Sequence, residues 1–493
     1  MTTTAKRAHH QVTFAVLAVG VGAYALLQSL VTPVLPTIQT ALHTSQTNVT
    51  WVLTAYLLSA SIFTPILGRL GDMRGKKKMF VIALVALAVG SLLAALATTL
   101  PIMIAARVIQ GVGGGVLPLA FGIIRDEFPS EKVGGAVGLI AALTAIGAGL
   151  GIVLAGPIVS ALNYHWLFWI PLIMIAAAAV AAVALVPESQ EKTPGRINWL
   201  TATLLSVWLV ALLIAVSEAP TWGWGSAKVL GLLAAAVVFG VVWVLVERRS
   251  SNPLIDMRMM AIRAVWTTNL VALMFGVAMY ALFAFLPEFL QTPSAAGYGF
   301  GASITKSGVM ILPQAVFMFL VGLVAGRLAQ RFGSKLVLIV GSLIGTAALV
   351  ILAFAHIQEW EIYLATALTG IGFGLAFSSM SNIIVSAVPR EQTGVASGMN
   401  ANIRTIGGSL GAAVMASIVT AKVAPSGLPV ESGYTNGFLM LAGAVFLSAV
   451  AGVFIPKITR HVVKHHTEEP DVALRHGELA MVPGGTVVGD ESE

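Results

Sequence analysis

The sequence predicts an all-α polytopic membrane protein, and three observations support this. Of its 493 residues, 57% are hydrophobic and only 10% are charged, whereas soluble globular domains carry about 25% charged residues. The hydrophobic residues gather in fourteen runs, each close to the ~20 residues that an α-helix needs to cross a bilayer. Lys and Arg fall mostly between alternate runs, as they do in multi-pass membrane proteins.

The fourteen predicted spans follow one another with short connections. A basic N-terminus, residues 1–11, leads directly into the first run without a small-residue cleavage site, so we expect a retained helix and not a signal peptide. After residue 456 the chain is polar and rich in Gly, which predicts a disordered cytoplasmic tail over 457–493. The spans are predicted at 12–35, 49–67, 79–99, 101–124, 134–157, 166–186, 197–217, 227–246, 265–289, 305–326, 336–356, 361–384, 394–420 and 436–456.

The distribution of positive charge orients the chain. An even number of spans puts both termini on one side of the membrane. Of the 28 Lys and Arg, three (Lys228, Lys306 and Lys422) lie on the opposite side and two (Arg107 and Arg404) lie within spans, which leaves 23 on the side of the termini. This excess places both termini in the cytoplasm. The net charge of +7 therefore reflects orientation in the lipid bilayer, and we expect no nucleic acid partner. The chain has no cysteine, which excludes disulfides and thiolate chemistry.

The chain also repeats itself. Three blocks recur in the same order at offsets of 258, 260 and 260 residues, which is more than chance matches of Gly and Ala would give. The pattern predicts two six-helix bundles, over 12–186 and 265–456, with a linker over 187–264 that holds two extra transmembrane helices. The recurring blocks are Gly68-Arg69-Leu70 with Gly326-Arg327-Leu328, residues 129–138 with 389–398, and Ile146-Gly147 with Ile406-Gly407.

One connection carries a specific pattern. Between the second and third spans lies Gly68-Arg69-Leu70-Gly71-Asp72-Met73-Arg74-Gly75-Lys76-Lys77-Lys78. By composition alone this is an ordinary basic cytoplasmic loop. Its spacing resembles the signature loop of the major facilitator superfamily, G-x-L-x-D-x-x-G-[RK]-[RK]. In the second copy of the loop, Gln330 stands where Asp72 stands in the first. The signature residues in this chain are Gly68, Asp72, Arg74, Gly75, Lys76 and Lys77.

The resemblance covers about residues 12–456. Two parallel six-helix repeats with a substrate site between them form the major facilitator fold, and the two extra central spans resemble the fourteen-spanner drug:proton antiporter family. Arg107-Val108-Ile109-Gln110-Gly111 resembles the R-x-x-Q-G motif of that family, and residues 397–408 resemble its penultimate-helix pattern. The resemblance implies a monomer in the bacterial cytoplasmic (inner) membrane. It would export amphipathic small molecules, with the proton gradient as energy source and no cofactor.

Charged residues inside spans are functional candidates, because a charge in hydrocarbon is costly unless it has a partner. Arg107 lies six residues into its span and Arg404 ten residues into its own, about 9 Å and about 15 Å deep. Each arginine either satisfies neighbouring carbonyls or contributes to proton coupling or substrate contact, as the resemblance implies for Arg107. We expect Asp72 to contact the opposite half near Gly394, where a helix N-terminus favours an anion.

Glu288 is the only acid that the prediction places inside a core-facing span. A carboxylate buried there could exchange protons near neutral pH. However, Glu288 is 23 residues into its span, about 35 Å along a straight helix, which indicates the outer interface unless Pro287 breaks the helix. Leu27 replaces the usual first-span acid of the family, and Ile152 replaces the proline of its fifth-span antiporter motif. Proton antiport therefore rests on the resemblance.

Polar and aromatic residues within spans of both halves are candidates for a substrate cavity, although each could equally pack in the core. Four methionines, Met274, Met279, Met310 and Met318, add adaptable apolar surface. Glycine runs at 111–115, 147–149 and 370–374 predict close helix packing. The sequence has no phosphate-binding G-x-x-x-x-G-K-[ST], no H-E-x-x-H metal motif and no other sign of an enzyme. The candidates for substrate binding are Tyr24, Gln28, Trp51, Tyr56, Gln110, Asn269, Tyr280, Gln314, Asn382 and Asn400.

Three functions stay open at this point. The first is a proton-coupled exporter of amphipathic small molecules. Its two intramembrane arginines, without a clear midplane acid, favour neutral or anionic substrates over lipophilic cations. The second is a lipid or metabolite transporter of the same fold without proton coupling. The third is a sensor or scaffold, which would need a folded soluble domain. The longest polar segment is the tail at 457–493, so the third function is disfavoured.

Overall fold

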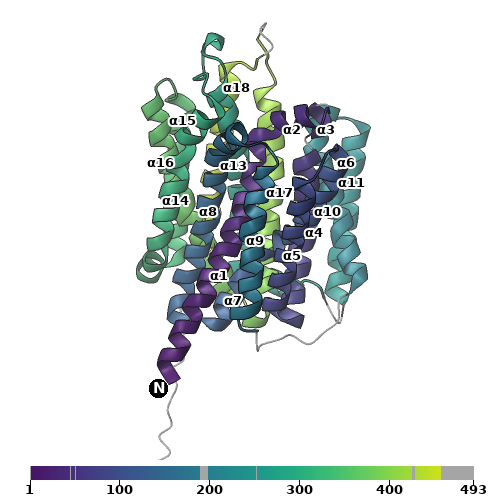
Figure 1. Cartoon of the computed structure of the whole chain (residues 1–493), viewed down its shortest axis with the longest axis vertical. Coiled ribbons are helices and arrows are strands. Elements are labelled where there is room, and N and C mark those ends of the chain that lie inside the picture. The colour runs from purple at the N-terminus through teal and green to yellow at the C-terminus, as the bar shows by residue number, and fades with distance from the viewer. Residues whose placement is uncertain are drawn as a thin grey trace, which may run out of the picture. The chain divides into compact units, whose positions relative to one another are not determined.

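Long helices make up the structure, a computed structural model that describes residues 2–44, 46–49, 51–188, 198–250, 253–424 and 428–456. The predictions for the tail 457–493 and for the linker segment 189–197 lie outside these residues. Within the described residues no strand is present, and one isolated β-bridge joins Val423 and Pro429. Figure 1 shows the long helices lying side by side.

The helices follow the predicted apolar runs closely. Thirteen helical segments, within the described ranges, are long and apolar enough to cross a membrane, and one of them, Leu100–Glu127, consists of α6 (Leu100–Gly111) and α7 (Val116–Glu127) with a short turn between them. The thirteenth predicted span, 394–420, is the 27-residue helix α17, but it is not among these thirteen segments, because Asn, Ser, Thr and Arg404 lower its hydropathy. The count of fourteen spans therefore stays a prediction. The long helices are α1 (Thr2–Leu30), α4 (Trp51–Arg74), α5 (Lys76–Ala95), α6 (Leu100–Gly111), α7 (Val116–Glu127), α8 (Ser130–Ala161), α9 (Trp166–Leu185), α10 (Trp199–Trp222), α11 (Ala227–Arg249), α13 (Arg263–Gln291), α14 (Ile304–Phe332), α15 (Ser334–Phe354), α16 (Glu359–Ala387), α17 (Thr393–Val419) and α18 (Glu431–Val453).

Short elements join the long helices. They are η1 (Thr32–Val34), α2 (Leu35–Ala41), α3 (Gln46–Val49), η2 (Val112–Gly115), α12 (Met257–Met260), η3 (Ser294–Ala296) and η4 (Arg390–Gln392). The 3-10 turn η2 interrupts the predicted span 101–124 at its glycine run. We call α1 to α9 the N-terminal helix group and α13 to α18 the C-terminal helix group. Met1–Lys457 form one compact unit, so the predicted division into two bundles stays a prediction.

The two helix groups meet along α8 and α14, which run antiparallel. Small residues occupy this contact from end to end, where they let two backbones approach closely. A Cβ atom on Gly326 would lie 2.6 Å from the Cα of Gly135, and one on Gly308 would lie 2.9 Å from the Cα of Val153. These positions admit no side chain, so glycine sets the distance between the groups along this seam.

The second seam, between α4 and α17, is close at one end. A Cβ on Gly68 would lie 2.6 Å from the carbonyl oxygen of Gly394, and one on Gly398 would lie 3.1 Å from that of Thr64. These residues lie in the last turns of α4 and the first turns of α17. We call this end of the structure the signature end, because it holds the signature residues.

The two extra central helices lie beside this second seam. Helix α10 packs on α17 and, less extensively, on α4, and Figure 1 shows α11 beside α10. Leu205, Leu209 and Leu213 of α10 share one apolar cluster with Ile66 of α4 and Met399 of α17. In addition, the hydroxyls of Thr54 and Ser217 lie 3.4 Å apart, and the Trp224 indole donates to the Ser417 hydroxyl at 2.9 Å. Helix α10 therefore touches both helix groups.

The signature stretch is not a loop, which corrects the sequence prediction. Helix α4 continues to Arg74, α5 begins at Lys76, and Gly75 alone makes the turn with φ +113°. Gly333 makes the same kind of turn between α14 and α15 with φ +85°. Only glycine adopts such angles without strain, so a single glycine is enough to make each turn. Polar helix ends carry no apolar signal, which is why they were predicted as a loop.

We expect alanine at Gly75 or Gly333 to lower stability by about 1–3 kcal/mol, because it forces a side chain into a sparsely populated backbone conformation. Thermal unfolding of the detergent-purified protein measures this. A Cβ on Gly333 has no atom within 4 Å, so Gly333→Ala reports backbone strain alone.

The matched control is Gly231→Ala in α11, where a Cβ also meets nothing within 4 Å and φ is ordinary. Alanine is favoured over glycine inside a helix by about 0.5–1 kcal/mol, so this variant should unfold no earlier than the wild type. Equal midpoints for Gly333→Ala and Gly231→Ala would show that the turn needs no glycine.

Candidate functional site

Asp72 joins the two helix groups at the signature end. Its carboxylate is fully buried and accepts hydrogen bonds from the backbone N–H of Gly394 at 3.3 Å and of Val395 at 3.1 Å. These amides belong to the first turn of α17, where the helix dipole attracts an anion. The Lys76 ammonium lies 3.9 Å from Asp72 and donates to both oxygens of Asp126, at 3.0 and 2.8 Å. The contact is the one expected from the sequence.

Two further contacts cross between the groups at this end. The Arg125 guanidinium of α7 donates to the Val388 carbonyl at 2.6 Å and to the Thr393 hydroxyl at 2.7 Å. The Gln330 amide of α14 donates to the Glu131 carbonyl at 2.9 Å, in the first turn of α8. Gln330 is the repeat counterpart of Asp72, so both copies of the signature loop contact the beginning of a helix in the opposite group.

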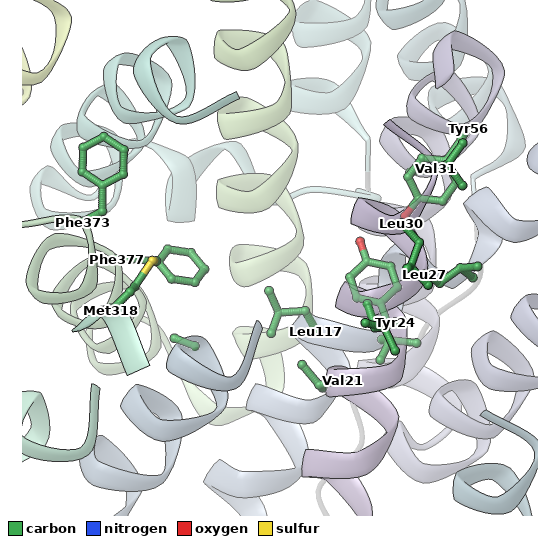
Figure 2. Packing of buried hydrophobic residues seen from close by; sticks show 14 of the residues in the cluster. Val21, Tyr24, Leu27, Leu30, Val31, Tyr56, Leu117, Met318, Phe373 and Phe377 are labelled. Atoms are coloured by element: carbon green, nitrogen blue, oxygen red, sulfur yellow. The ribbon is translucent and has the colours of Figure 1, made fainter. Parts of the chain in front are cut away.

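A cavity of about 280 Å³ lies between the two groups, farther from the signature end. Figure 2 shows Tyr24 and Tyr56 on one side, Met318 and Phe377 on the other, and Leu117 between them. Between this cavity and the signature end, a space of only about 10 Å³ is left among residues that include Leu117, Phe121 and Asn400. The residues that line the cavity are Tyr24, Ala25, Gln28, Ser29, Thr32, Leu53, Tyr56, Leu57, Arg107, Leu117, Thr144, Ile152, Met279, Tyr280, Phe283, Ala284, Met318, Phe377, Arg404, Thr405, Gly408, Ser409 and Ala412.

Both intramembrane arginines reach this cavity, one from each helix group. The Arg107 guanidinium lies 4.5 Å from the centre of the Tyr56 ring, and that of Arg404 lies 4.6 Å from the centre of the Phe377 ring. A cation over an aromatic face is stabilised electrostatically. Neither arginine forms an ion pair with an acid of the described residues. Their side chains are 1% and 7% exposed, so both charges are desolvated.

The two arginines differ in their hydrogen bonds. Arg107 donates from Nε to the Val52 carbonyl at 2.9 Å and from Nη1 to the Gln110 amide oxygen at 2.7 Å. The Nε of Arg404 has no acceptor within the described part of the chain. Arg107 is thus held in place by its own helix group, whereas Arg404 keeps a donor without a partner at the cavity.

The structure places four of the ten substrate-binding candidates at the cavity, namely Tyr24, Gln28, Tyr56 and Tyr280. Met279 and Met318 also line it, and Met274 and Met310 do not. Gln110 is engaged by Arg107 and donates to Ser91 at 3.1 Å. The six candidates that lie outside the cavity are Trp51, Gln110, Asn269, Gln314, Asn382 and Asn400.

Pairing and packing explain why those polar residues lie elsewhere. Asn400 donates to the Asn269 amide oxygen at 2.9 Å, so these two amides satisfy one another between α13 and α17. Gln314 and Asn382 are buried on α14 and α16, and Trp51 begins α4. Polarity within a span therefore does not by itself indicate a cavity.

Small hydroxyl residues of the cavity were missed by the sequence analysis, among them Ser29, Thr32, Thr405 and Ser409. Spacing was an available signal for one of them. Residues four apart lie on one helix face, so carrying Gln28 one turn along the chain would have found Thr32. No candidate lies three or four positions from Ser29, Thr405 or Ser409, so spacing held no signal for these three.

Glu288 lies in the last turn of α13 with an exposed side chain, and the Tyr434 hydroxyl donates to its Oε1 at 3.1 Å. Helix α13 continues through Pro287 to Gln291, so Pro287 does not break the helix. Glu288 is not the only acid inside a long helix, because α4 extends to include Asp72 and α10 to include the buried Glu218. Glu288 lies one turn beyond Ala284, a residue of the cavity wall.

Several known proteins are similar to this chain. It is 27% identical over 423 residues to Multidrug resistance protein 3 of Bacillus subtilis (strain 168), covering 85% of this chain and 81% of that protein. It is 29% identical over 420 residues to the Tetracenomycin C resistance and export protein of Streptomyces glaucescens, covering 83% and 76%.

A crystal structure of the human organic anion transporter MFSD10 (TETRAN) has a TM-score of 0.65 to this structure, at 16% identity, and covers 90% of this chain and 99% of that one. This likeness concerns the fold alone. The profile of the Major Facilitator Superfamily matches residues 17–412 and again 270–483, so that the second match begins inside the C-terminal helix group. Because the first match covers most of the chain, the protein belongs to the Major Facilitator Superfamily and is a multi-pass membrane transporter.

Proposed function

We propose that the protein exports amphipathic small molecules by alternating access. The observation that carries this proposal is the cavity between the two helix groups, which is walled off on the side of the signature end by the contacts of Asp72, Arg125 and Gln330. Substrate sites of such transporters lie between the repeats near the midplane. The lining is mostly aromatic and apolar with a few polar groups, which suits amphipathic molecules.

The names of the relatives support the class of substrate. Multidrug resistance protein 3 and Multidrug transporter protein MdtP of Bacillus subtilis are named for many drugs, and the Streptomyces protein for tetracenomycin C. This chain covers more than two thirds of the length of each of these three relatives. Export of drugs or toxic metabolites is therefore the proposed activity, and the specific compound is left open.

The orientation is part of the proposal. The excess of Lys and Arg on the side of the termini supports two cytoplasmic termini in a bacterial inner membrane, with a monomer as the transporting unit. The signature end then faces the cytoplasm. In this orientation the contacts at the signature end would close the protein toward the cytoplasm, and we propose that Asp72 stabilises that closure.

We propose exchange for protons as the energy source, with Glu288 as the proton carrier. Glu288 supports this role by position, since its exposed carboxylate lies one turn beyond Ala284 of the cavity wall. A specific observation also favours a second candidate, a lipid or metabolite transporter without proton coupling. The position of the usual first-span acid, Leu27, is an apolar core residue with 1% exposure, and the residues that line the cavity include no carboxylate.

Purified protein in liposomes with an inward proton gradient tests the exchange. We expect an added amphiphile to raise proton flux into the vesicles, and Glu288→Gln to abolish that flux because the amide cannot carry a proton. Internal pH reports the flux, and substrate uptake is measured in parallel.

The control variant is Glu359→Gln, which removes an exposed carboxylate of α16 that pairs with Lys306. It should leave the flux unchanged. Substrate movement without any proton flux would favour the uncoupled candidate, and the absence of movement for every amphiphile would refute export.

Asp72→Asn should open the signature end. It removes the charge from two hydrogen bonds to helix amides, which are worth about 1.5–3 kcal/mol each when charged, so the closed state should lose about tenfold or more in population. The chain lacks cysteine, so single cysteines report the change. We expect faster thiol labelling at Ser397→Cys, below the cavity, and slower labelling at Ser409→Cys, on its wall.

Lys78→Gln is the control, since Lys78 lies in the first turn of α5 with an exposed side chain and is not one of the signature residues. It should leave both labelling rates at the wild-type values. Wild-type labelling and transport in Asp72→Asn, at normal expression, would show that the Asp72 contact does not hold the closed state.

A further inference from the structure

We propose that the cavity binds amphipathic anions, molecules with an aromatic or apolar body and one sulfonate or carboxylate group. Arg404 makes the main contact to the anionic group, and Arg107 adds attraction from the opposite helix group. This inference rests on the proposed function, because it names the charge of the exported substrate.

The charge of the cavity wall favours an anionic ligand. Among the described residues two arginines and no Asp or Glu line the cavity, so two positive charges act on a space of about 280 Å³. Glu288 lies one turn beyond the wall and accepts a hydrogen bond from the Tyr434 hydroxyl. Within a low-dielectric site such charges act strongly on a ligand, and a cation would be repelled by both.

The hydrogen bonding of Arg404 also favours a ligand with acceptor oxygens. A buried donor without an acceptor is unfavourable, and the Arg404 Nε is such a donor among the described residues. A sulfonate or carboxylate supplies several acceptor oxygens, and charge-assisted hydrogen bonds to guanidinium are the strong ones. Arg107 already donates to Val52 and Gln110, so its contribution is mainly electrostatic.

The remaining wall accommodates the body of such a molecule. Tyrosine hydroxyls from both helix groups, those of Tyr24, Tyr56 and Tyr280, can donate to the same anionic group, and the rings of Phe283 and Phe377 with Met279 and Met318 offer an apolar surface. The hydroxyls of Ser29, Thr144, Thr405 and Ser409 also line the cavity but donate to backbone carbonyls of their own helices. Each anionic acceptor thus has donors on both sides of the interface that alternating access opens and closes.

Three naphthalene probes of nearly equal size test the binding step. They are 2-naphthalenesulfonate, which is a permanent anion, neutral 2-naphthalenesulfonamide, and the permanent cation (2-naphthyl)trimethylammonium. We expect the purified protein to bind the radiolabelled sulfonate in a scintillation proximity assay about tenfold or more tighter than the other two, since each charge-assisted hydrogen bond contributes at about this level. Arg404→Gln should abolish the preference, and Arg404→Lys should retain part of it.

Arg331→Gln is the matched control. Arg331 also lies over an aromatic ring, 5.3 Å from the centre of Phe332, but it is exposed in the last turn of α14 and does not line the cavity. It should leave the preference for the sulfonate intact. Tighter binding of the cation, or an equal preference in Arg404→Gln, would overturn the inference.

A transport measurement separates this inference from the proposed function. In strongly buffered vesicles at equal pH, valinomycin and a tenfold potassium gradient make the interior positive. A carrier that moves the sulfonate alone transfers one negative charge inward and accumulates the sulfonate about tenfold. A carrier that exchanges it for one outgoing proton transfers the equivalent of two negative charges and accumulates it about a hundredfold. Accumulation of the cation alone, with the interior made negative, would overturn the anion site and leave export standing. Arg404-dependent binding without accumulation of any probe would support the site and refute export.

Discussion

The carboxylate of Asp72, held by the first amides of α17, is the interaction on which the arrangement of the two helix groups depends. The contact requires the backbones of α4 and α17 to touch one another, and Gly68 and Gly394 allow this because they have no side chain. A Cβ on Gly394 would lie 2.9 Å from the Asp72 Oδ1, so any larger residue would displace the carboxylate from the amides. The closed signature end, and with it the depth of the cavity, follows from this contact.

The bilayer makes most of this fold predictable from sequence. A helix must be long and apolar to cross hydrocarbon, so the apolar runs predict the helices and miss mainly their polar ends, as where the span 305–326 is the helix Ile304–Phe332. The cavity was predictable only in part. Tyr24 and Asn400 are both large and polar within spans, and only three-dimensional pairing shows that Asn400 bonds to Asn269 whereas Tyr24 lines the cavity.

The duplication is visible in contacts as well as in sequence, and the two copies have diverged in charge. Asp72 and Gln330 occupy matching positions, but a buried carboxylate on helix amides binds more strongly than a neutral amide on one carbonyl. Arg107 and Arg404 do not occupy matching positions of the repeat, and they differ in their hydrogen bonds, since Arg107 donates to Val52 and Gln110 whereas the Arg404 Nε has no acceptor among the described residues. The N-terminal group thus supplies the charged contact at the signature end, and the C-terminal group supplies the donor without an acceptor at the cavity.

The position of α10 has a consequence for how a lipophilic molecule reaches the cavity. The seam between α8 and α14 is filled by interlocking backbone and small side chains, and the seam between α4 and α17 is covered by α10. A compound dissolved among the lipid tails therefore meets a sealed wall at both seams. Entry and exit must pass through the aqueous ends of the protein, where a charged headgroup can stay hydrated until it reaches the arginines.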